Sequence, residues 1–123
     1  AEIEALLLAT GLVAEAAAIA IPDSVKGSAV VCVCVPARGA APGQAQVTEL
    51  KQAVAAGLGG AFAPKSVLFV DDLPKTRSMK IMRRVVRNLV CGEAPGDLSG
   101  LADRAAVDAV ERALADWRDT SKG

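Results

Sequence analysis

The sequence contains no histidine and no tyrosine, and its aromatic residues are two phenylalanines and one tryptophan. Without histidine, we expect no zinc site of the Cys/His kind and no Ser-His or Cys-His catalytic pair within these 123 residues. Because large rings are so few, interdigitating Val, Ile and Leu side chains must supply most of a buried core. Hydrophobic residues at 52% and charged residues at 23% are typical of one globular domain.

The cysteines do not have the spacing of a disulfide framework. Cys32 and Cys34 lie two residues apart in an apolar run, so a strand would point both to one face, and Cys91 stands alone. This pattern predicts buried, reduced thiols. No apolar run reaches the roughly 18 residues of a membrane helix, and the first residues lack a secretory signal. The sequence therefore predicts a cytoplasmic protein without a membrane partner.

Hydrophobic periodicity predicts an α+β fold, with a small sheet of three or slightly more strands covered by helices. Three apolar runs bounded by turn residues are the expected strands, at 13–21, 29–35 and 66–70. The middle run has no clearly polar face, which predicts a central position in the sheet. Helices are expected at 1–10, 47–58 and 78–90, and after Asp103 as N-cap, with a frayed tail at 119–123.

One segment is strongly basic, although the 14 basic and 14 acidic residues balance overall. A helix that begins near Ser78 would place its four cations in a ridge opposite a stripe of Met, Val and Leu side chains. Two interpretations stay open: a solvated helix face, or a surface for an anion such as a phosphate or a carboxylate. Nucleic acid is disfavoured, because the segment lacks aromatic residues for base stacking. The basic residues of the segment are Lys75, Arg77, Lys80, Arg83, Arg84 and Arg87.

The same segment carries a family resemblance. The stretch FVDDLPKTRSMKIMRR resembles the signature of AMP-forming acyl-CoA synthetases, whose short-chain members typically read LPKTRSGKIMRR. Three further blocks match the acetyl- and propionyl-CoA synthetase type in the same order: AEIEALL and VAEAAAIAIPDSVKG upstream, and GEAPGDLSGL downstream. Residues 1–123 thus resemble the mobile C-terminal lid domain of adenylate-forming enzymes, beginning just past the hinge and without the large N-terminal adenylating domain.

The resemblance implies that Lys80 is catalytic, and that it engages the acyl carboxylate and the α-phosphate of ATP before the thioester forms with CoA. The parent enzyme would be an acid-thiol ligase that uses ATP, CoA and a short-chain carboxylate. Mg²⁺ would lie on the missing adenylating domain, which would be the main partner. This domain alone is expected to hold no metal or cofactor and to be inactive. Arg77, Arg83 and Arg84 are candidate phosphate or partner contacts, with a purely structural role equally open.

Lys80 is also the candidate modification site in an alternative function, in which the domain is a lysine-acetylation substrate or interaction module for a protein acetyltransferase. In either role Lys80 is expected to be exposed, because a buried unpaired ammonium is too costly. Met79 replaces the family's glycine, which predicts a negative φ there and disfavours an acetyltransferase. Ala55 and Ala56 stand where many acetyl-CoA synthetases carry arginine and lysine. Adenylation is therefore predicted more strongly than CoA as the acyl acceptor.

Overall fold

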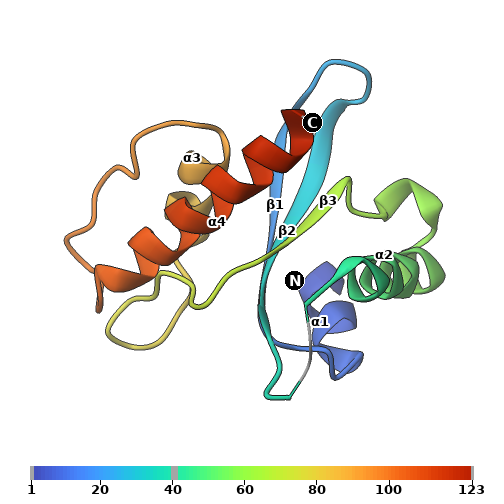
Figure 1. Cartoon of the computed structure of the whole chain (residues 1–123), viewed down its shortest axis with the longest axis horizontal. Helices are drawn as coiled ribbons and strands as arrows, with labels where there is room; N and C mark the ends of the chain where they lie inside the picture. The colour runs from blue at the N-terminus through green and yellow to red at the C-terminus, as the bar shows by residue number, and fades with distance from the viewer. Residues whose placement is uncertain (1, 40–41, 123) are drawn as a thin grey trace.

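The computed structural model describes residues 2–39 and 42–122 of the chain. It confirms the α+β fold class, since a small sheet of mixed strand directions is packed against helices (Figure 1). The elements are α1 Glu2–Ala9, β1 Val13–Asp23, β2 Gly27–Pro36, α2 Gln44–Leu58, a 3-10 turn η1 Gly60–Phe62, β3 Ser66–Phe69, α3 Arg83–Val90 and α4 Ala105–Lys122.

The three predicted apolar runs form one sheet in the order β1-β2-β3. β1 and β2 are an antiparallel hairpin that closes at the pair Asp23↔Gly27, with a register shift between Val13 and Glu15. β3 runs parallel to β2, starting from the pair Val31↔Ser66. The predicted central position of the middle run is confirmed, because β2 pairs on both sides.

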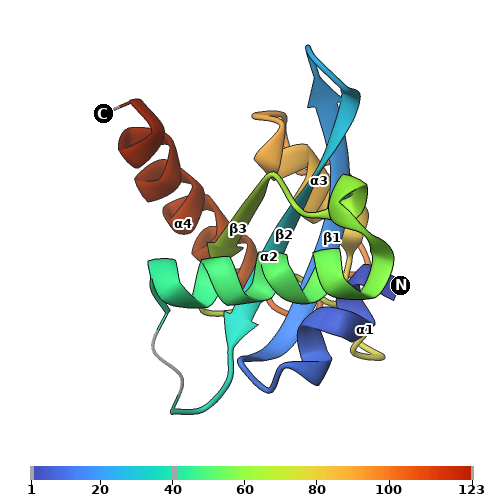
Figure 2. The same ribbon diagram turned by 90° about the vertical axis from the view of Figure 1, so that its right-hand side faces the viewer.

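Helices cover both faces of the sheet. α1 and α2 lie on one side, and α3 and α4 lie on the other (Figures 1 and 2). The alternation of side chains along β2 divides the core between them: Val31 and Val33 pack toward α3 and α4, whereas Cys32 and Cys34 pack toward α1 and α2. Burial raises the pKa of both thiols to about 12, so they are inert neutral groups. All three cysteines are free, as predicted.

The first and last helices follow their sequence signals. α1 ends near Gly11, whose φ of +76° is the left-handed conformation that glycine adopts at helix ends. Asp103 caps α4 as predicted, because its carboxylate accepts a hydrogen bond from the amide of Ala105 at 3.0 Å. The expected fraying at 119–123 stays a prediction: α4 reaches Lys122, and Gly123 lies outside the described residues.

The helix predicted from Ser78 is wrong in its first turn, since α3 begins only at Arg83. Residues 75–81 form a turn instead, whose two sides meet in the antiparallel bridge Lys75↔Ile81. The amide of Met82 then donates to the carbonyl of Pro74 at 2.8 Å, so it is already used before the helix starts. Lys80 consequently does not share a helical ridge with the arginines. No helix in the described ranges is long and apolar enough to cross a bilayer.

Candidate functional site

Lys80 follows the tip of a tight hairpin turn between β3 and α3. The amide of Met79 donates to the carbonyl of Thr76 at 2.8 Å, and the amide of Thr76 donates to the carbonyl of Lys80 at 2.8 Å. The Thr76 hydroxyl lies inside the turn, where it accepts from the amide of Lys80 at 3.2 Å and pairs with the Ser78 hydroxyl at 3.0 Å. This bonding belongs to a three-residue hairpin loop whose last residue is left-handed.

Met79 occupies that left-handed position, with φ of +69°, and is the non-glycine residue with positive φ in the described chain. The prediction of a negative φ at Met79 is therefore wrong. The physical reason is the turn itself, because its third loop residue must be left-handed to bring the two stems together. The glycine of the related signature meets this requirement without strain, whereas methionine has a Cβ that opposes it.

Met79→Gly is therefore expected to stabilise the chain by about 1 kcal/mol, because a left-handed non-glycine residue costs roughly 1–2 kcal/mol and glycine is more flexible when unfolded. Little packing is lost, since Met79 is 67% exposed. Urea unfolding followed by circular dichroism measures the change. Met79→Ala is the control: it removes the same side chain but keeps the Cβ, and its stability should stay within about 0.5 kcal/mol of the original chain. An equal gain in both variants would contradict the backbone explanation.

The Lys80 side chain is exposed, as the sequence analysis predicted. Within the described residues its ammonium has no hydrogen-bond or ion-pair partner, and only its backbone groups are used by the turn. Each of the other five cations of the basic segment has a partner within the chain. Lys80 is therefore set apart from its neighbours as a free positive charge.

Lys75 is held on the other side of the turn. Its ammonium contacts Glu15 Oε1 and Asp72 Oδ1, each at 2.8 Å, and its side chain is only 12% exposed. Burial disfavours the charged form of Lys75, but the hydrogen bond that it donates to Asp72 and the nearby Glu15 carboxylate outweigh burial and raise the pKa of Lys75. The charge of Lys75 is already matched in this conformation, which favours a structural role.

Arg83 binds Glu4 through two nitrogens. Its Nε lies 2.7 Å from Glu4 Oε2, and its Nη2 contacts Oε1. Glu4 Oε2 also accepts from the amide of Ala18 on β1 at 2.8 Å. Burial favours the neutral acid, but the hydrogen bonds from Arg83 and Ala18 outweigh it, so the pKa of Glu4 lies below its usual range. Arg83 thereby ties the start of α3 to α1 and β1.

The remaining arginines bind backbone carbonyls. Arg77 Nη1 donates to Ser99 O at 3.4 Å, Arg84 Nη2 to Asp97 O at 2.8 Å, and Arg87 Nε to Ala20 O at 2.9 Å. These contacts leave further guanidinium donors unassigned, so a phosphate or partner contact by Arg77, Arg83 or Arg84 stays a prediction. The three arginines bind different groups, at Ser99, Glu4 and Asp97, and Lys80 contacts none of these groups in the described part of the chain.

The acid dependence of stability should reveal the Glu4 pair. A carboxyl with a lowered pKa in the folded state adds stability above its unfolded pKa of about 4.3, and this contribution is lost as pH falls through the folded pKa. Glu4→Gln should therefore be less stable than the original chain at pH 6, and the difference should shrink toward pH 3. Urea unfolding at each pH measures it. Glu49→Gln, which removes an exposed carboxylate on α2, should show no such convergence; a constant gap for Glu4→Gln would contradict the assignment.

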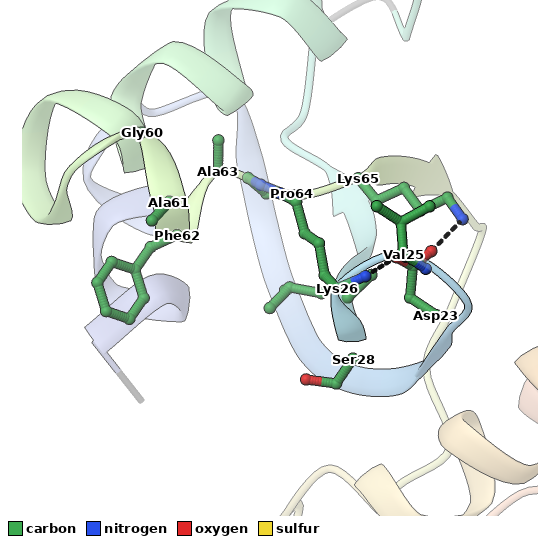
Figure 3. Close-up of a pocket in the computed structure, with 12 residues that line it drawn as sticks. Asp23, Val25, Lys26, Ser28, Gly60, Ala61, Phe62, Ala63, Pro64 and Lys65 are labelled. Atoms are coloured by element: carbon green, nitrogen blue, oxygen red, sulfur yellow. Dashed lines mark hydrogen bonds and ion pairs between the residues drawn. The ribbon is translucent and has the colours of Figure 1, made fainter.

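A separate hollow of about 570 Å³ lies between the β1–β2 turn and η1. Figure 3 shows Phe62 on one side and Asp23, which pairs with Lys65 at 3.0 Å, on the other. In Figure 1 the β1–β2 turn and the yellow turn that carries Lys80 lie at opposite ends of the molecule. Within the described residues no group of three or more Cys, Asp or Glu side chains is placed to hold a metal ion. The hollow is therefore remote from Lys80 and supplies no reactive group beside it.

Sequence reasoning missed the two carboxylates, Glu4 and Glu15, that contact the basic segment from distant parts of the chain. Glu4 lies three residues before buried Leu7 on α1, and Glu15 is the acid inside the apolar run of β1. An acid at an apolar position signals a buried ion pair, because an unpaired carboxylate is too costly there. The positions of these acids could have predicted buried ion pairs, but the sequence does not show which cation each carboxylate binds.

The fold and the turn together define a class of small domain: a three-stranded sheet between two helical layers, with an exposed lysine beside a left-handed turn residue. The comparisons agree with this definition. The chain belongs to the AMP-binding enzyme C-terminal domain family, whose model matches residues 2–80.

The curated proteins similar to this chain include two kinds of coenzyme A synthetase. The chain is 40% identical over 117 residues to the 3-hydroxypropionyl-coenzyme A synthetase of Sulfurisphaera tokodaii, covering 95% of this chain and 18% of that protein. It is 42% identical over 112 residues to the acetyl-coenzyme A synthetase of Methanothrix soehngenii, covering 91% of this chain and 17% of that protein. The chain thus spans less than a fifth of these relatives.

Solved structures share the fold. The acyl-CoA synthetase of Brucella canis matches with a TM-score of 0.69 and 32% identity, over 72% of this chain and 16% of that one. The acetoacetyl-CoA synthetase of Streptomyces lividans matches with a TM-score of 0.78, over 94% of this chain and 18% of that one. At 17% identity the second match supports the fold alone.

Proposed function

We propose that this domain supplies Lys80 to the adenylation step of an AMP-forming short-chain acyl-CoA synthetase. Its parent enzyme is an acid-thiol ligase, and its working partner is the adenylating domain of the same parent chain. The single observation that carries the proposal is the free ammonium of Lys80 on a projecting turn, in a segment whose other cations are all engaged. A compact charge on a flexible stem suits a group that must reach an anion held elsewhere.

The chemistry takes place in two steps. In the first, a carboxylate oxygen of the acid attacks the α-phosphorus of ATP, the bond to the β-phosphate oxygen breaks, and pyrophosphate leaves. In the second, the CoA thiol attacks the acyl carbon, loses its proton, and displaces AMP. Lys80 acts in the first step, where two anions meet and charge grows on the phosphoryl oxygens. Mg²⁺ would be held by the adenylating domain and would neutralise charge on the phosphates of ATP there.

The substrate class is a short-chain carboxylate. The relatives named for acetyl and 3-hydroxypropionyl substrates support it, because both acids have short chains. CoA as the acceptor rests on the same relatives. It is not supported by a cation at the C-terminal end of α2, where Ala55 and Ala56 stand.

The test compares Lys80→Ala with Lys65→Ala in the parent enzyme. Lys65 is an exposed lysine in a 3.0 Å ion pair with Asp23, remote from the turn, so its loss controls for removing a surface charge. Carboxylate-dependent pyrophosphate exchange should fall only in Lys80→Ala. Undiminished exchange in that variant would overturn the proposed function.

A second candidate function is that of a lysine-acetylation substrate, or an interaction module, for a protein acetyltransferase. The exposed and unpaired Lys80 favours it, because a modifying enzyme needs an accessible ammonium. The strained Met79 beside the lysine disfavours it, since a bulky neighbour replaces the small glycine. The exchange experiment separates the two functions, because undiminished exchange in Lys80→Ala would leave modification as the role of this lysine.

A further inference from the structure

The turn that carries Lys80 is attached to the rest of the domain by an ion pair on each side. Lys75, five residues before Lys80, binds Glu15, and Arg83, three residues after it, binds Glu4. Both carboxylates belong to the first part of the chain, on β1 and α1. The two stems of the turn are therefore anchored to the same unit of the fold, although they have no direct chain connection to it.

In the first anchor the Lys75 side chain is 12% exposed, whereas the Glu15 and Asp72 side chains are 32% and 46% exposed. The Lys75 ammonium lies 2.8 Å from Glu15 Oε1 and from Asp72 Oδ1, and 3.3 Å from the carbonyl of Leu73. The carbonyl of Lys75 accepts from the amide of Ala102 at 2.9 Å, so the backbone of the stem is fixed as well. Movement of the ammonium would break both ion pairs at once, which favours a single position of this stem.

The second anchor, the Arg83–Glu4 ion pair, fixes the orientation of the start of α3. Two guanidinium nitrogens of Arg83 meet the two oxygens of Glu4, and this planar two-bond geometry sets the orientation of the side chain as well as its distance. Glu4 is itself oriented by the amide of Ala18 and is 7% exposed. The start of α3 is thereby held at one angle to β1.

The ammonium of Lys80 has no partner of its own in the described chain, so its position depends on the turn that carries it. Its backbone position is set by the turn, and the turn is set by its stems, which pair at Lys75↔Ile81. We propose that Glu15 and Glu4 are positioning residues for Lys80: they hold the two stems so that the turn presents the ammonium along one direction. This inference rests on the proposed role of Lys80 in adenylation.

A double-mutant cycle in the parent enzyme tests the proposal. Glu15→Gln keeps the shape of the side chain and leaves Asp72 for Lys75, so the variant is expected to fold. It should lower the kcat of pyrophosphate exchange by about tenfold to a hundredfold, because displacing a catalytic group by about 1 Å costs that much. The KM for the carboxylate and the AMP-releasing second step should stay unchanged. In a Lys80→Ala background, Glu15→Gln should have no further effect on exchange.

Glu4→Gln is the second variant and should show the same dependence on Lys80. Lys65→Gln, which breaks the remote Asp23 pair, should keep the full rate. An equal loss from Glu15→Gln with and without Lys80 would show a merely structural role and overturn the proposal, as would a folded Glu15→Gln variant with the original rate. If Lys80→Ala itself kept the full exchange rate, the proposed function would be overturned instead.

Discussion

Lys80→Ala in the parent enzyme is expected to slow acyl-adenylate formation by about 10²- to 10³-fold, the usual effect of losing one preorganised donor to a developing oxyanion. The reason is electrostatic. A carboxylate and a triphosphate repel one another as they approach, and the attack adds charge to the α-phosphoryl oxygens. An ammonium that is already in place, with no partner of its own to give up, offsets this repulsion without reorganisation.

Thioester formation from a supplied acyl-adenylate should change little in the same variant. The phosphorus–oxygen bond has then already formed, and AMP leaves with its charge distributed over a single phosphate group. The two steps are measured separately, as pyrophosphate exchange and as AMP release from synthetic acyl-adenylate plus CoA. Equal losses in both would indicate that Lys80 maintains the fold or the contact between domains rather than the transition state.

Leu50→Ala should produce the second largest effect, a loss of about 3 kcal/mol of stability, because deleting a buried leucine side chain leaves a cavity. Leu50 on α2 is fully buried in the cluster that joins α1 and α2 to Cys32 and Cys34 of the sheet. A domain of this size has a total stability on the order of 5–15 kcal/mol, so the loss is a large part of it.

Urea unfolding followed by circular dichroism gives the change directly, as a lower midpoint at unchanged slope. Leu8→Ala is the matched control, because Leu8 lies on neighbouring α1 but is 44% exposed. Its effect should stay within about 0.5 kcal/mol. A similar loss in the two variants would contradict the docking of α2 on the sheet.

The three strands could be predicted because each is a short apolar run between turn residues, and the central run has no polar face. Helix α4 could be predicted for a similar reason, since Asp103 marks its start and its apolar positions recur at helical spacing. In these elements the local pattern and the tertiary packing favour the same structure.

The start of α3 could not be predicted from the residues alone. Met79 and Met82 continue the helical spacing of Val86 and Leu89, so the apolar pattern extends one turn beyond the true helix. The hydrogen bonds of the turn use the same backbone groups in another way, and they prevail although Met79 is strained. Lys80 was identified by its sequence motif and not by its geometry.

The partners of the basic segment were likewise hidden, since Glu4 and Arg83 lie 79 residues apart in sequence. Only the folded chain shows that α1 and α3 both pack against β1 and bring the two side chains together. Charge spacing along one helix therefore did not show that five of the six cations are engaged within the domain. Carboxylates contact two of these cations, and backbone carbonyls accept hydrogen bonds from the other three.

The outer edge of β1 gains a second property from these contacts. An unpaired strand edge offers its amides and carbonyls to any other extended chain, and can thereby nucleate aggregation. Here the Ala18 amide is taken by Glu4, and the Ala20 carbonyl is taken by Arg87. Two side chains thus block the middle of a long edge strand against pairing with another copy. We expect acid that protonates Glu4 to weaken the block at Ala18, whereas the Arg87 contact at Ala20 does not depend on this titration.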